Sequence, residues 1–301
     1  MDSINQKEEI AFLLPVYNGE FSIERTLISI LKQEYKFFKI YIINNGSIDN
    51  TLSIINKFAL KDKRILIYNQ DIPNLSKALC LGLDLIEEEL ILRIDSGDTC
   101  DIYRAKRTLE FMKKNKNCAI SYTDYFIQMK DKLVFNSLPE ILSKKDFLFK
   151  NKIAHSTICI RKSFLKKYNF SYAGIGKENL YYGPSQDLFI LSIAIFVFNL
   201  EVAKIPNTSS IITKNIKNSI SYLNKDEQRR VASIILFINN IKFLSSFKFF
   251  KFALISLFGL IINGIRLIKY GSIIKFFKLI YKLYLLNSKD KFIYQALIKI
   301  K

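Results

Sequence analysis

The sequence predicts an α/β fold built on a mostly parallel sheet that is flanked by helices. Three observations lead to this prediction. Apolar segments of strand length alternate with segments in which apolar residues recur at helical spacing, two of the strands run straight into polar loops, and 301 residues suffice for one large domain with an appendage. Strands that alternate with helices of about a dozen residues are typical of parallel sheets covered on both faces.

The first two strands are expected at residues 11–14 and 39–43, and they lead into polar loops at 15–20 and 44–51. The apolar positions that follow at helical spacing are Ile23, Leu27, Ile30 and Leu31 after the first loop, and Leu52, Ile55 and Phe58 after the second. In open α/β sheets the ligand lies outside the carboxyl ends of the strands, where helix N-termini offer unpaired N–H groups. The two loops therefore predict a nucleotide pocket.

A third strand at 64–68 leads to a polar segment at 69–74 and a helix from about 76 to 88. A fourth strand at 90–94 ends in Asp95-Ser96-Gly97-Asp98. Two carboxylates at the tip of an apolar strand are poorly explained by solubility and indicate a functional loop, although a simple acidic turn is the alternative.

The second half of the chain is less regular. The expected elements are strands at 119–122, 125–129 and 156–160, and helices at 143–149, 162–168 and 188–198. Residues 174–185 have a loop composition, and Gln186-Asp187 then opens the last of these helices, where a carboxylate is favourable for the helix dipole.

The formal charge of +19 is concentrated in the C-terminal quarter, where residues 225–301 hold 15 basic and 3 acidic side chains, a net charge of +12. Charge alone allows nucleic acid or an anionic membrane as a partner. Here the lysines alternate with Phe, Ile and Leu rather than with polar residues and Gly, which favours a membrane surface and disfavours nucleic acid.

The basic residues of this quarter lie three or four positions apart, which places each group on one helix face. The groups are Lys248 and Lys251, Arg266 and Lys269, and Lys275, Lys278 and Lys282. The longest uncharged run, 252–265, has fourteen residues, fewer than the roughly 20 that span a bilayer. We predict a helical membrane-associating region at 223–301 after a main domain at 1–222, with helices that pack on that domain, or a true span or re-entrant hairpin, as alternatives.

Cysteine spacing and the N-terminus bear on the cellular compartment. The four cysteines are widely spaced without a C-x-x-C pair, and there is a single histidine, so zinc and disulfide frameworks are disfavoured. The first nine residues have no apolar core like that of a signal peptide. A cytoplasmic protein with reduced thiols is expected.

Several ordered motifs together resemble a known family. They are Leu14–Gly19, Asn45–Ser47 with Asp49–Thr51, Asn74–Leu79, Arg93–Asp98, His155–Thr157 with Arg161–Lys162, Gln186–Leu188 and Ser219–Ser221. Over about residues 8–222 the chain resembles family 2 glycosyltransferases of the GT-A fold, of the bacterial type that builds surface polysaccharides and lipo-oligosaccharides. Each motif alone is weak, and the set in this order is specific.

The resemblance implies that the first two loops bind the nucleoside of a sugar nucleotide, usually a uridine diphosphate. Pro15 and Tyr17 match positions that line the base, and Asn45 matches a position where the family typically has an Asp that bonds uracil. An amide can still accept from the uracil N3–H and adds donors. Asn44 replaces a second usual Asp and is interpreted either as a turn residue or as a direct contact. Lys77 either reaches the donor phosphate or lies on a solvated helix face.

The resemblance also implies a divalent cation, Mn²⁺ or Mg²⁺, at the acidic loop, where it would neutralise the diphosphate leaving group. Asp98 matches the metal position and Asp95 a ribose or metal position, whereas Gly97 stands where the family usually has a further acid. Arg93 is predicted to contribute to the nucleotide-sugar site, either by pairing with Asp95 or by contacting the diphosphate.

Asp187 matches the catalytic base of the family, with Gln186 where a Glu is common; without the motifs around it, an N-cap role would be equally plausible. His155 matches a position that faces the cleft, as a phosphate or acceptor contact. Ser219 and Ser221 match a loop that closes over the donor, and Lys217 lies near them.

The resemblance therefore predicts an inverting, metal-dependent glycosyltransferase. It would move a sugar from a nucleoside-diphosphate sugar to a saccharide or lipid-linked acceptor, as a peripheral protein at the cytoplasmic face of the inner membrane. Because Asn44, Asn45, Gly97 and Gln186 depart from the family pattern, a non-catalytic relative that binds nucleotide sugars or partner enzymes at the membrane is the alternative.

Overall fold

The computed structural model describes residues 9–129, 132–175, 185–213, 229, 231–236 and 239–240. The strands are β1 (Ile10–Val16), β2 (Phe38–Asn45), β3 (Ile65–Gln70), β4 (Leu90–Arg93), β5 (Thr99–Cys100), β6 (Cys118–Met129), β7 (Lys132–Asn136), β8 (Cys159–Arg161), β9 (Phe170–Ser171), β10 (Gly174–Ile175) and β11 (Glu201–Thr213). The helices are α1 (Ile23–Leu31), α2 (Thr51–Ala59), α3 (Leu75–Leu85), α4 (Arg104–Lys114), α5 (Lys162–Tyr168) and α6 (Gln186–Ser192), with 3₁₀ helices η1 (Lys144–Phe147) and η2 (His155–Thr157) and a π-helical turn η3 (Ile193–Val197).

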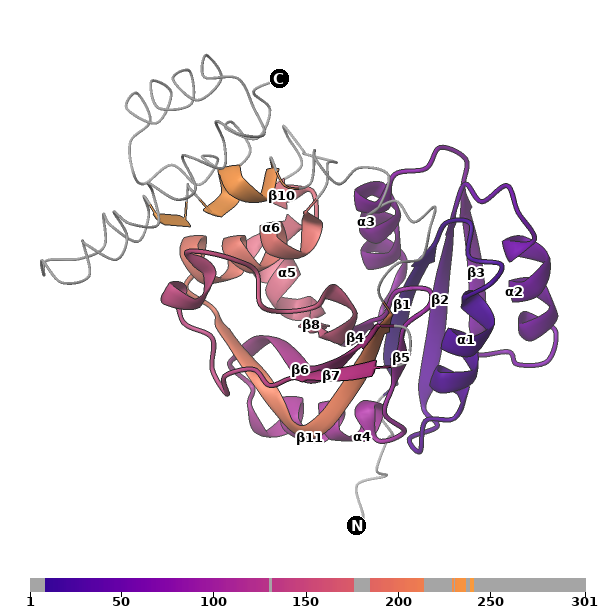
Figure 1. The fold of residues 1–301 in the computed structure, drawn as a ribbon, viewed down its shortest axis with the longest axis horizontal. Coiled ribbons are helices and arrows are strands. Elements are labelled where there is room, and N and C mark those ends of the chain that lie inside the picture. Colours follow the sequence, from indigo (N-terminus) through magenta and orange to yellow (C-terminus); the bar gives the residue numbers. More distant parts are fainter. Residues whose placement is uncertain are drawn as a thin grey trace, which may run out of the picture.

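Within these residues one nine-stranded sheet has the order β3-β2-β1-β4-β8-β6-β11-β5, with β7 paired to β6. Strands β9 and β10 form a separate hairpin. Figure 1 shows α1 and α2 beside β1, β2 and β3 on one side of the molecule, and α5, α6 and β11 on the other. The predicted α/β architecture with flanking helices is confirmed.

The first half of the sheet is parallel throughout. Strand β2 pairs in parallel with both β1 and β3, and β1 pairs in parallel with β4. Val16 lies opposite Asn44, which in turn lies opposite Asn69, so the carboxyl ends of the three strands are level. The polar loops that follow these strands therefore meet at one edge of the sheet, as predicted.

The second half of the sheet is mixed. Strand β8 runs antiparallel to β4 and to β6, while β11 runs parallel to β6 and antiparallel to β5. The short strand β5 pairs Cys100 with Ser210, so the chain that follows the acidic loop is attached directly to the end of β11. The two ends of the acidic loop thus belong to different halves of the sheet.

Several predicted elements of the second half need correction. The two strands expected at 119–122 and 125–129 are one strand, β6, because Asp124 is satisfied within it by Lys204 Nζ (3.2 Å) and by the backbone N–H of Leu138 (2.7 Å). The strand expected at 156–160 begins as the 3₁₀ helix η2, and only β8 is extended. The helix expected at 162–168 is confirmed as α5.

Six elements were not predicted: α4, β5, β7, β9, β10 and β11. Helix α4 does carry a signal, since Ala105, Leu109 and Met112 recur at helical spacing and are buried. Strand β11 contains Pro206 and a run of polar residues, and it forms because β6 and β5 pair with it from both sides.

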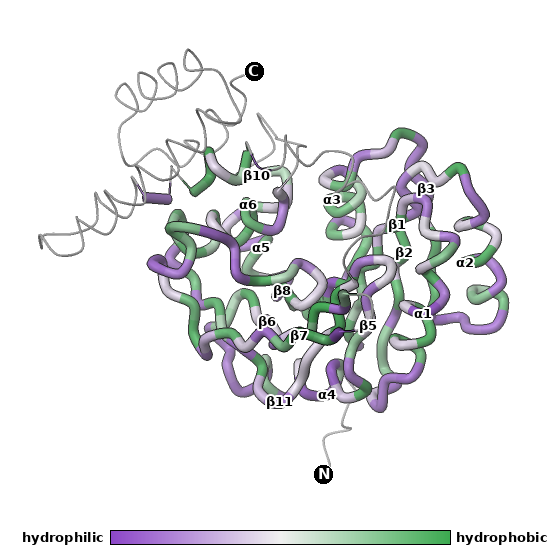
Figure 2. The backbone as a smooth tube through the Cα atoms, in the orientation of Figure 1, coloured by the Kyte–Doolittle hydropathy of each residue, from purple (hydrophilic) through white to green (hydrophobic). Residues whose placement is uncertain are grey.

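The hydrophobic core has two layers, one on each face of the sheet. Along β1, Ala11 and Leu13 face the layer that contains α3 and α6, and Phe12 and Leu14 face the layer that contains α1 and α4. This alternation is what a strand buried on both faces requires. Figure 2 shows the hydrophobic colouring of the central strands and the hydrophilic colouring of many peripheral loops.

Residues beyond 222 also enter the core. Val231, Ile234, Ile235 and Leu236 are at most 5% exposed and pack in the layer that contains α6. The boundary between 222 and 223 stays a prediction, and the basic amphipathic helices expected after 240 lie outside the described residues. Among the described residues no helix is long and apolar enough to cross a membrane.

Candidate active site

The loops after β1 and β2 are joined by hydrogen bonds. The backbone N–H of Asn18 donates to Ser47 Oγ (3.0 Å), and that of Gly19 donates to Thr51 Oγ1 (2.7 Å). A Cβ on Gly19 would lie 2.8 Å from Ser96 Oγ of the acidic loop, closer than a real Cβ approaches. Glycine at position 19 therefore allows the first loop to pack against the acidic loop.

Two pairs of amide side chains link the ends of β2 and β3. Asn44 Nδ2 donates to Asn69 Oδ1 (3.0 Å), and Gln70 Nε2 donates to Asn45 Oδ1 (2.8 Å). Asn45 Oδ1 also accepts from the backbone N–H of Asn74 (2.8 Å). Because a backbone N–H can only donate, the atom of Asn45 that faces it must be the oxygen. That oxygen is fully used inside the protein, so what Asn45 can still offer a ligand is its Nδ2 donor.

The other residues predicted for the nucleotide site lie at the end of β1 and at the start of α3. Pro15 is buried near the end of β1, and Tyr17 follows it and is half-buried. Asn74 caps α3 by accepting from the backbone N–H of Lys77 (3.0 Å). The Lys77 side chain is exposed on the first turn of that helix.

The acidic loop brings Asp95 and Asp98 together around one hydroxyl. Ser156 Oγ, from η2, lies 3.1 Å from Asp95 Oδ2 and 2.5 Å from Asp98 Oδ2, and it accepts from the backbone N–H of Asp95 (2.8 Å). Ser156 is 1% exposed. The buried hydroxyl therefore fixes the spacing of the two carboxylates from the protein interior.

Two threonines hold the remainder of the loop. The backbone N–H of Thr213 donates to Asp98 Oδ1 (2.8 Å), and its hydroxyl donates to the carbonyl of Gly97 (3.0 Å). Thr26 Oγ1, from α1, accepts from the N–H of Gly97 (2.8 Å) and donates to the carbonyl of Asp98 (2.8 Å). Gly97 has a φ of +100°, a conformation that a residue with a Cβ rarely adopts, which explains a glycine where an acid was expected.

Arg93 lies behind Asp95. Its side chain is 1% exposed and donates to Asp95 Oδ1, whereas the Asp95 side chain is 39% exposed. Arg93 also donates to the carbonyls of Leu13 and Ile94. Of the two roles predicted for Arg93, this arrangement favours pairing with Asp95 over direct contact with a diphosphate.

The two carboxylates of the loop have opposite electrostatic surroundings. Burial and the charge of Asp95 raise the pKa of Asp98 to about 7. Burial also opposes ionisation of Asp95, but the charge of Arg93 and the hydrogen bonds from Arg93 and Ser156 outweigh it and lower its pKa. A cation placed between them would relieve their repulsion.

The described residues contain no cluster of three or more His, Cys, Asp or Glu side chains that could hold a metal ion. The available ligands at this edge are the two carboxylates. Mg²⁺ in phosphate-handling sites is commonly held by one or two carboxylates together with substrate phosphates, so Asp95 and Asp98 fit such an ion.

Asp187 lies in the first turn of α6, after Ser185 with a left-handed φ of +64°. Its Oδ2 accepts from Asn151 Nδ2 (2.7 Å). Burial is the main influence on its pKa and raises it, the Asn151 hydrogen bond acts in the opposite direction, and the charge of Asp95 raises it further. The Asn151 hydrogen bond ties this carboxylate to the loop that leads into η2, and its role as the base stays a prediction.

His155 precedes Ser156 and contacts Tyr172. His155 Nε2 lies 2.9 Å from the Tyr172 hydroxyl, and the rings meet edge to face. Burial and the nearby charge of Arg93 lower the pKa of His155 to about 3, so the ring is neutral at physiological pH. Tyr172 is fully buried and senses the charges of Asp95 and Asp187.

The structure thus joins Asp95 and Asp98 through Ser156, the neighbour of His155, and bonds Asp187 to Asn151 in the loop that leads to them, while Pro15, Tyr17 and Asn45 lie at the neighbouring strand ends. Sequence reasoning missed four residues that support them: Asn151, Ser156, Tyr172 and Thr213. Only Ser156 had a signal, because it stands inside a recognised motif. The segment with Lys217, Ser219 and Ser221 lies outside the described residues.

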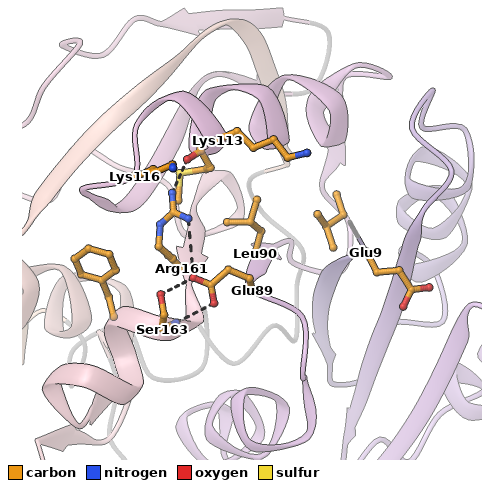
Figure 3. A pocket seen from close by; sticks show the side chains of 10 residues that line it. Glu9, Glu89, Leu90, Lys113, Lys116, Arg161 and Ser163 are labelled. Carbon is orange, nitrogen blue, oxygen red and sulfur yellow. Dashed lines mark hydrogen bonds and ion pairs between the residues drawn. The ribbon is translucent and has the colours of Figure 1, made fainter. Parts of the chain in front are cut away.

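A pocket of about 730 Å³ lies elsewhere, at the amino ends of β1 and β4. In Figure 3, Glu89 lies between Arg161 and Ser163, and Lys113 and Lys116 stand on the other side of the pocket. Arg161 is already engaged by the carbonyls of Met112 (2.6 Å) and Cys118 (3.1 Å). None of the predicted site residues lines this pocket, which is at the opposite edge of the sheet from the acidic loop.

Comparison with curated proteins identifies similar glycosyltransferases. The chain is 32% identical over 176 residues to the UDP-Glc:alpha-D-GlcNAc-diphosphoundecaprenol beta-1,3-glucosyltransferase WfaP of Escherichia coli, covering 57% of this chain and 67% of WfaP. It is 27% identical over 160 residues to the putative teichuronic acid biosynthesis glycosyltransferase TuaG of Bacillus subtilis, covering 52% of this chain and 63% of TuaG.

Solved structures agree on the fold. S. aureus TarS 1–349 in complex with UDP-GlcNAc aligns over 97% of this chain and 90% of its own, with a TM-score of 0.60 and 16% identity. The mannosyltransferase PcManGT from Pyrobaculum calidifontis, in complex with GDP-Man and Mn²⁺, aligns over 97% of this chain and 85% of its own, with a TM-score of 0.59 and 12% identity.

These likenesses support the GT-A fold. The family model described as Glycosyl transferase family 2 matches residues 12–170, just over half of the chain. The span includes both polar loops, the acidic loop and the 3₁₀ helix with His155. The chain belongs to glycosyltransferase family 2.

Proposed function

We propose that the chain is an inverting glycosyltransferase that moves a sugar from a nucleoside-diphosphate sugar to a saccharide or lipid-linked acceptor in the synthesis of a bacterial surface glycan. The observation that carries the proposal is the pair of carboxylates Asp95 and Asp98, joined through Ser156 at the carboxyl edge of the sheet, with Asp187 bonded to Asn151 in the loop that leads to Ser156. A separate, half-buried carboxylate beside an acidic pair suits a base on one side of a sugar and a diphosphate on the other.

In the proposed reaction the acceptor hydroxyl oxygen attacks the anomeric carbon of the donor. The bond between that carbon and the diphosphate oxygen breaks, and its electron pair leaves with the nucleoside diphosphate. Asp187 takes the hydroxyl proton, for which its raised pKa is suitable, because a general base works best when its pKa approaches the operating pH. A single displacement of this kind inverts the anomeric centre.

Asp95 and Asp98 are proposed to hold Mn²⁺ or Mg²⁺ together with the diphosphate. When bound, the cation supplies positive charge to the departing diphosphate. Ser156 and Thr213 hold the two carboxylates in place. The similarity to a Mn²⁺-containing mannosyltransferase structure supports a metal at this loop without identifying the ion.

The donor is proposed to carry uridine. The names of WfaP and of the TarS complex both specify a UDP-sugar, which supports the proposal, whereas PcManGT was solved with GDP-Man. Pro15, Tyr17 and Asn45 are proposed to line the base, Arg93 to act through Asp95, and Lys77 to approach the phosphates from α3.

The acceptor is proposed to be lipid-linked and to be met at the cytoplasmic face of the inner membrane. The name of WfaP specifies a diphosphoundecaprenol acceptor, and the lysines of residues 223–301 alternate with apolar residues as in helices that lie on an anionic surface. His155 is proposed to contact the acceptor or the donor phosphate.

The test of the activity uses the full chain in detergent. Nucleoside diphosphate release is measured for a panel of UDP-, GDP-, CDP- and dTDP-sugars with a lipid-linked saccharide extract, each with and without Mn²⁺ or Mg²⁺. We expect release with at least one UDP-sugar that depends on the added cation and on the extract. Tight donor binding by calorimetry with no release from any donor would instead indicate a non-catalytic relative.

The membrane proposal has a separate test. Flotation with vesicles containing anionic lipid is measured for the full chain and for the triple variant Lys275→Glu, Lys278→Glu, Lys282→Glu. We expect the variant to lose most of its flotation, since each basic residue near an anionic surface contributes about 1 kcal/mol. The matched control reverses three exposed lysines beside α2, Lys57, Lys61 and Lys63, and should float like the wild type.

A further inference from the structure

The side chain that holds Asp187 has a defined orientation. Asn151 Nδ2 donates to Asp187 Oδ2 at 2.7 Å, while Asn151 Oδ1 accepts from the backbone N–H of Ile153 at 3.0 Å. Because the Ile153 N–H can only donate, the atom of Asn151 facing it is the oxygen, and the atom facing Asp187 is the NH₂ group. If the Asn151 amide were flipped, its NH₂ group would face the N–H of Ile153, and two donors would oppose each other.

This orientation distinguishes the two oxygens of Asp187. An oxygen that accepts a hydrogen bond from Asn151 is a poor place for a proton, because an O–H there would point at an N–H donor. We infer that Asn151 is a positioning residue that holds Asp187 Oδ2 and keeps the carboxylate in the ionised form that takes the proton of the acceptor hydroxyl. The inference rests on the proposed role of Asp187 as the base.

The loop that carries Asn151 is held through the residue that follows it. The next residue, Lys152, pairs through Nζ with Asp146 Oδ1 (2.8 Å), and its carbonyl accepts from the Tyr125 hydroxyl (3.1 Å). Asp146 belongs to η1 and is fixed by a capping box with Ser143. The loop that carries Asn151 is therefore attached to η1 and to β6.

A residue of the C-terminal helix connects this loop with α6. Asn239 Nδ2 donates to the carbonyl of Phe147 (3.3 Å), at the end of η1, and to Ser192 Oγ (3.0 Å), at the end of α6. Asn240 donates to the carbonyl of Leu148 (2.7 Å). Both asparagines are fully buried. The element with Asn151 and the element with Asp187 are thus bound to a common support, which preserves the distance between them.

The groups that face Asp187 from other elements set the direction of the expected effect. Burial and the charge of Asp95 oppose ionisation of Asp187, whereas the backbone N–H groups of Leu188 and Asp187 and the Asn151 amide favour it; the Tyr172 hydroxyl, between β9 and β10, senses its charge. Asn151 is therefore the side chain that favours the ionised form. Without it, Asp187 would stay protonated to a higher pH.

The experiment measures kcat/KM against pH for the full chain and two variants. Asn151→Ala removes the donor, and we expect the acidic limb of the profile to move by about one pH unit to higher pH. The donor KM should stay within about twofold of wild type, because Asn151 holds the base and not the nucleotide. Asn151→Asp keeps the shape and the oxygen that accepts from Ile153 but opposes Asp187 with a second carboxylate, and should move the limb further.

The control is Asn136→Ala, which removes an amide hydrogen bond to the carbonyl of Val134 on the exposed strand β7 and should leave the profile unchanged. A loss of activity by the same factor at every pH in the Asn151 variants would indicate a purely structural role and overturn the inference. An unchanged profile would overturn it too. These two results overturn only the inference about Asn151 when the wild type releases nucleoside diphosphate and Asp187→Asn does not. If the wild type releases none with any donor, the proposed function itself is overturned.

Discussion

The two halves of the sheet are built in different ways. From β1 to β4 the strands pair in parallel, and each ligand-facing loop follows its own strand directly. From β5 to β11 the sheet is mixed, and residues far apart meet, as Asp98 meets Thr213 across 115 positions. In the proposed site, the first half forms the edge that faces the nucleotide, with neutral amides and backbone groups, and the second half supplies the base and its supports. We expect substitutions in the first half to change donor affinity and those in the second to change turnover.

The largest effect is expected for Asp187→Asn, in the second half. The amide cannot take the acceptor proton, so kcat should fall by about 10²- to 10⁴-fold, the range of general-base catalysis. The dissociation constant of UDP, measured by calorimetry, should stay within about twofold. Retained turnover would remove the base assignment, and a large loss of UDP binding would remove the division between the halves.

Asp98→Asn tests the junction between the two halves of the sheet, because Asp98 belongs to the acidic loop that follows β4 and accepts a hydrogen bond from β11. The amide keeps an oxygen for the Thr213 N–H but loses the charge for a cation. We expect kcat/KM to fall about 100-fold and the response to added Mn²⁺ or Mg²⁺ to disappear. Asp101→Asn, three residues on, removes a carboxylate that pairs with Arg107 and should keep the full response to the cation.

His155 gives a prediction about stability against pH. Its pKa of about 3 in the folded chain lies below the ordinary value of about 6.5, so between these values the unfolded chain binds a proton that the folded chain does not. Stability is therefore lost as the pH falls from 7 to 5, by about 1–2 kcal/mol from this group. His155→Gln should lose less stability over the same interval in urea titrations; an equal loss would place the ring in a more solvated position.

The smallest effect is expected for Asn45→Asp, in the first half. The oxygen of Asn45 is already used by Gln70 and Asn74, and a carboxylate would add a second acceptor for the N3–H of uracil. UDP should bind about three- to tenfold more tightly, as for one additional hydrogen bond, with kcat unchanged. The neighbouring Asn44→Asp serves as the control, since Asn44 points to Asn69, and it should not tighten binding.

The same contrast explains what the sequence could predict. In the first half, local apolar periodicity and the polar loops after strands identified β1 to β4, α1 to α3 and the acidic loop, because each feature is encoded by adjacent residues. In the second half, β11 depends on pairing with β6 and β5, and local composition cannot indicate a distant partner. Asn151 and Thr213 were missed for this reason, since an Asn in a loop and a Thr at a strand end have many ordinary uses.

The buried C-terminal helix has a practical consequence for dividing the chain. Cutting at 222 would remove Val231, Ile234, Ile235 and Leu236 from the core, together with Asn239, which connects η1 with α6, and Asn240, which donates to the carbonyl of Leu148. Four buried aliphatic side chains represent about 6–12 kcal/mol of hydrophobic stabilisation, comparable to the whole stability of a typical domain. A shortened form for crystallisation should therefore end after Asn240. The deletion then removes the segment that is proposed to bind the membrane and leaves the buried core intact.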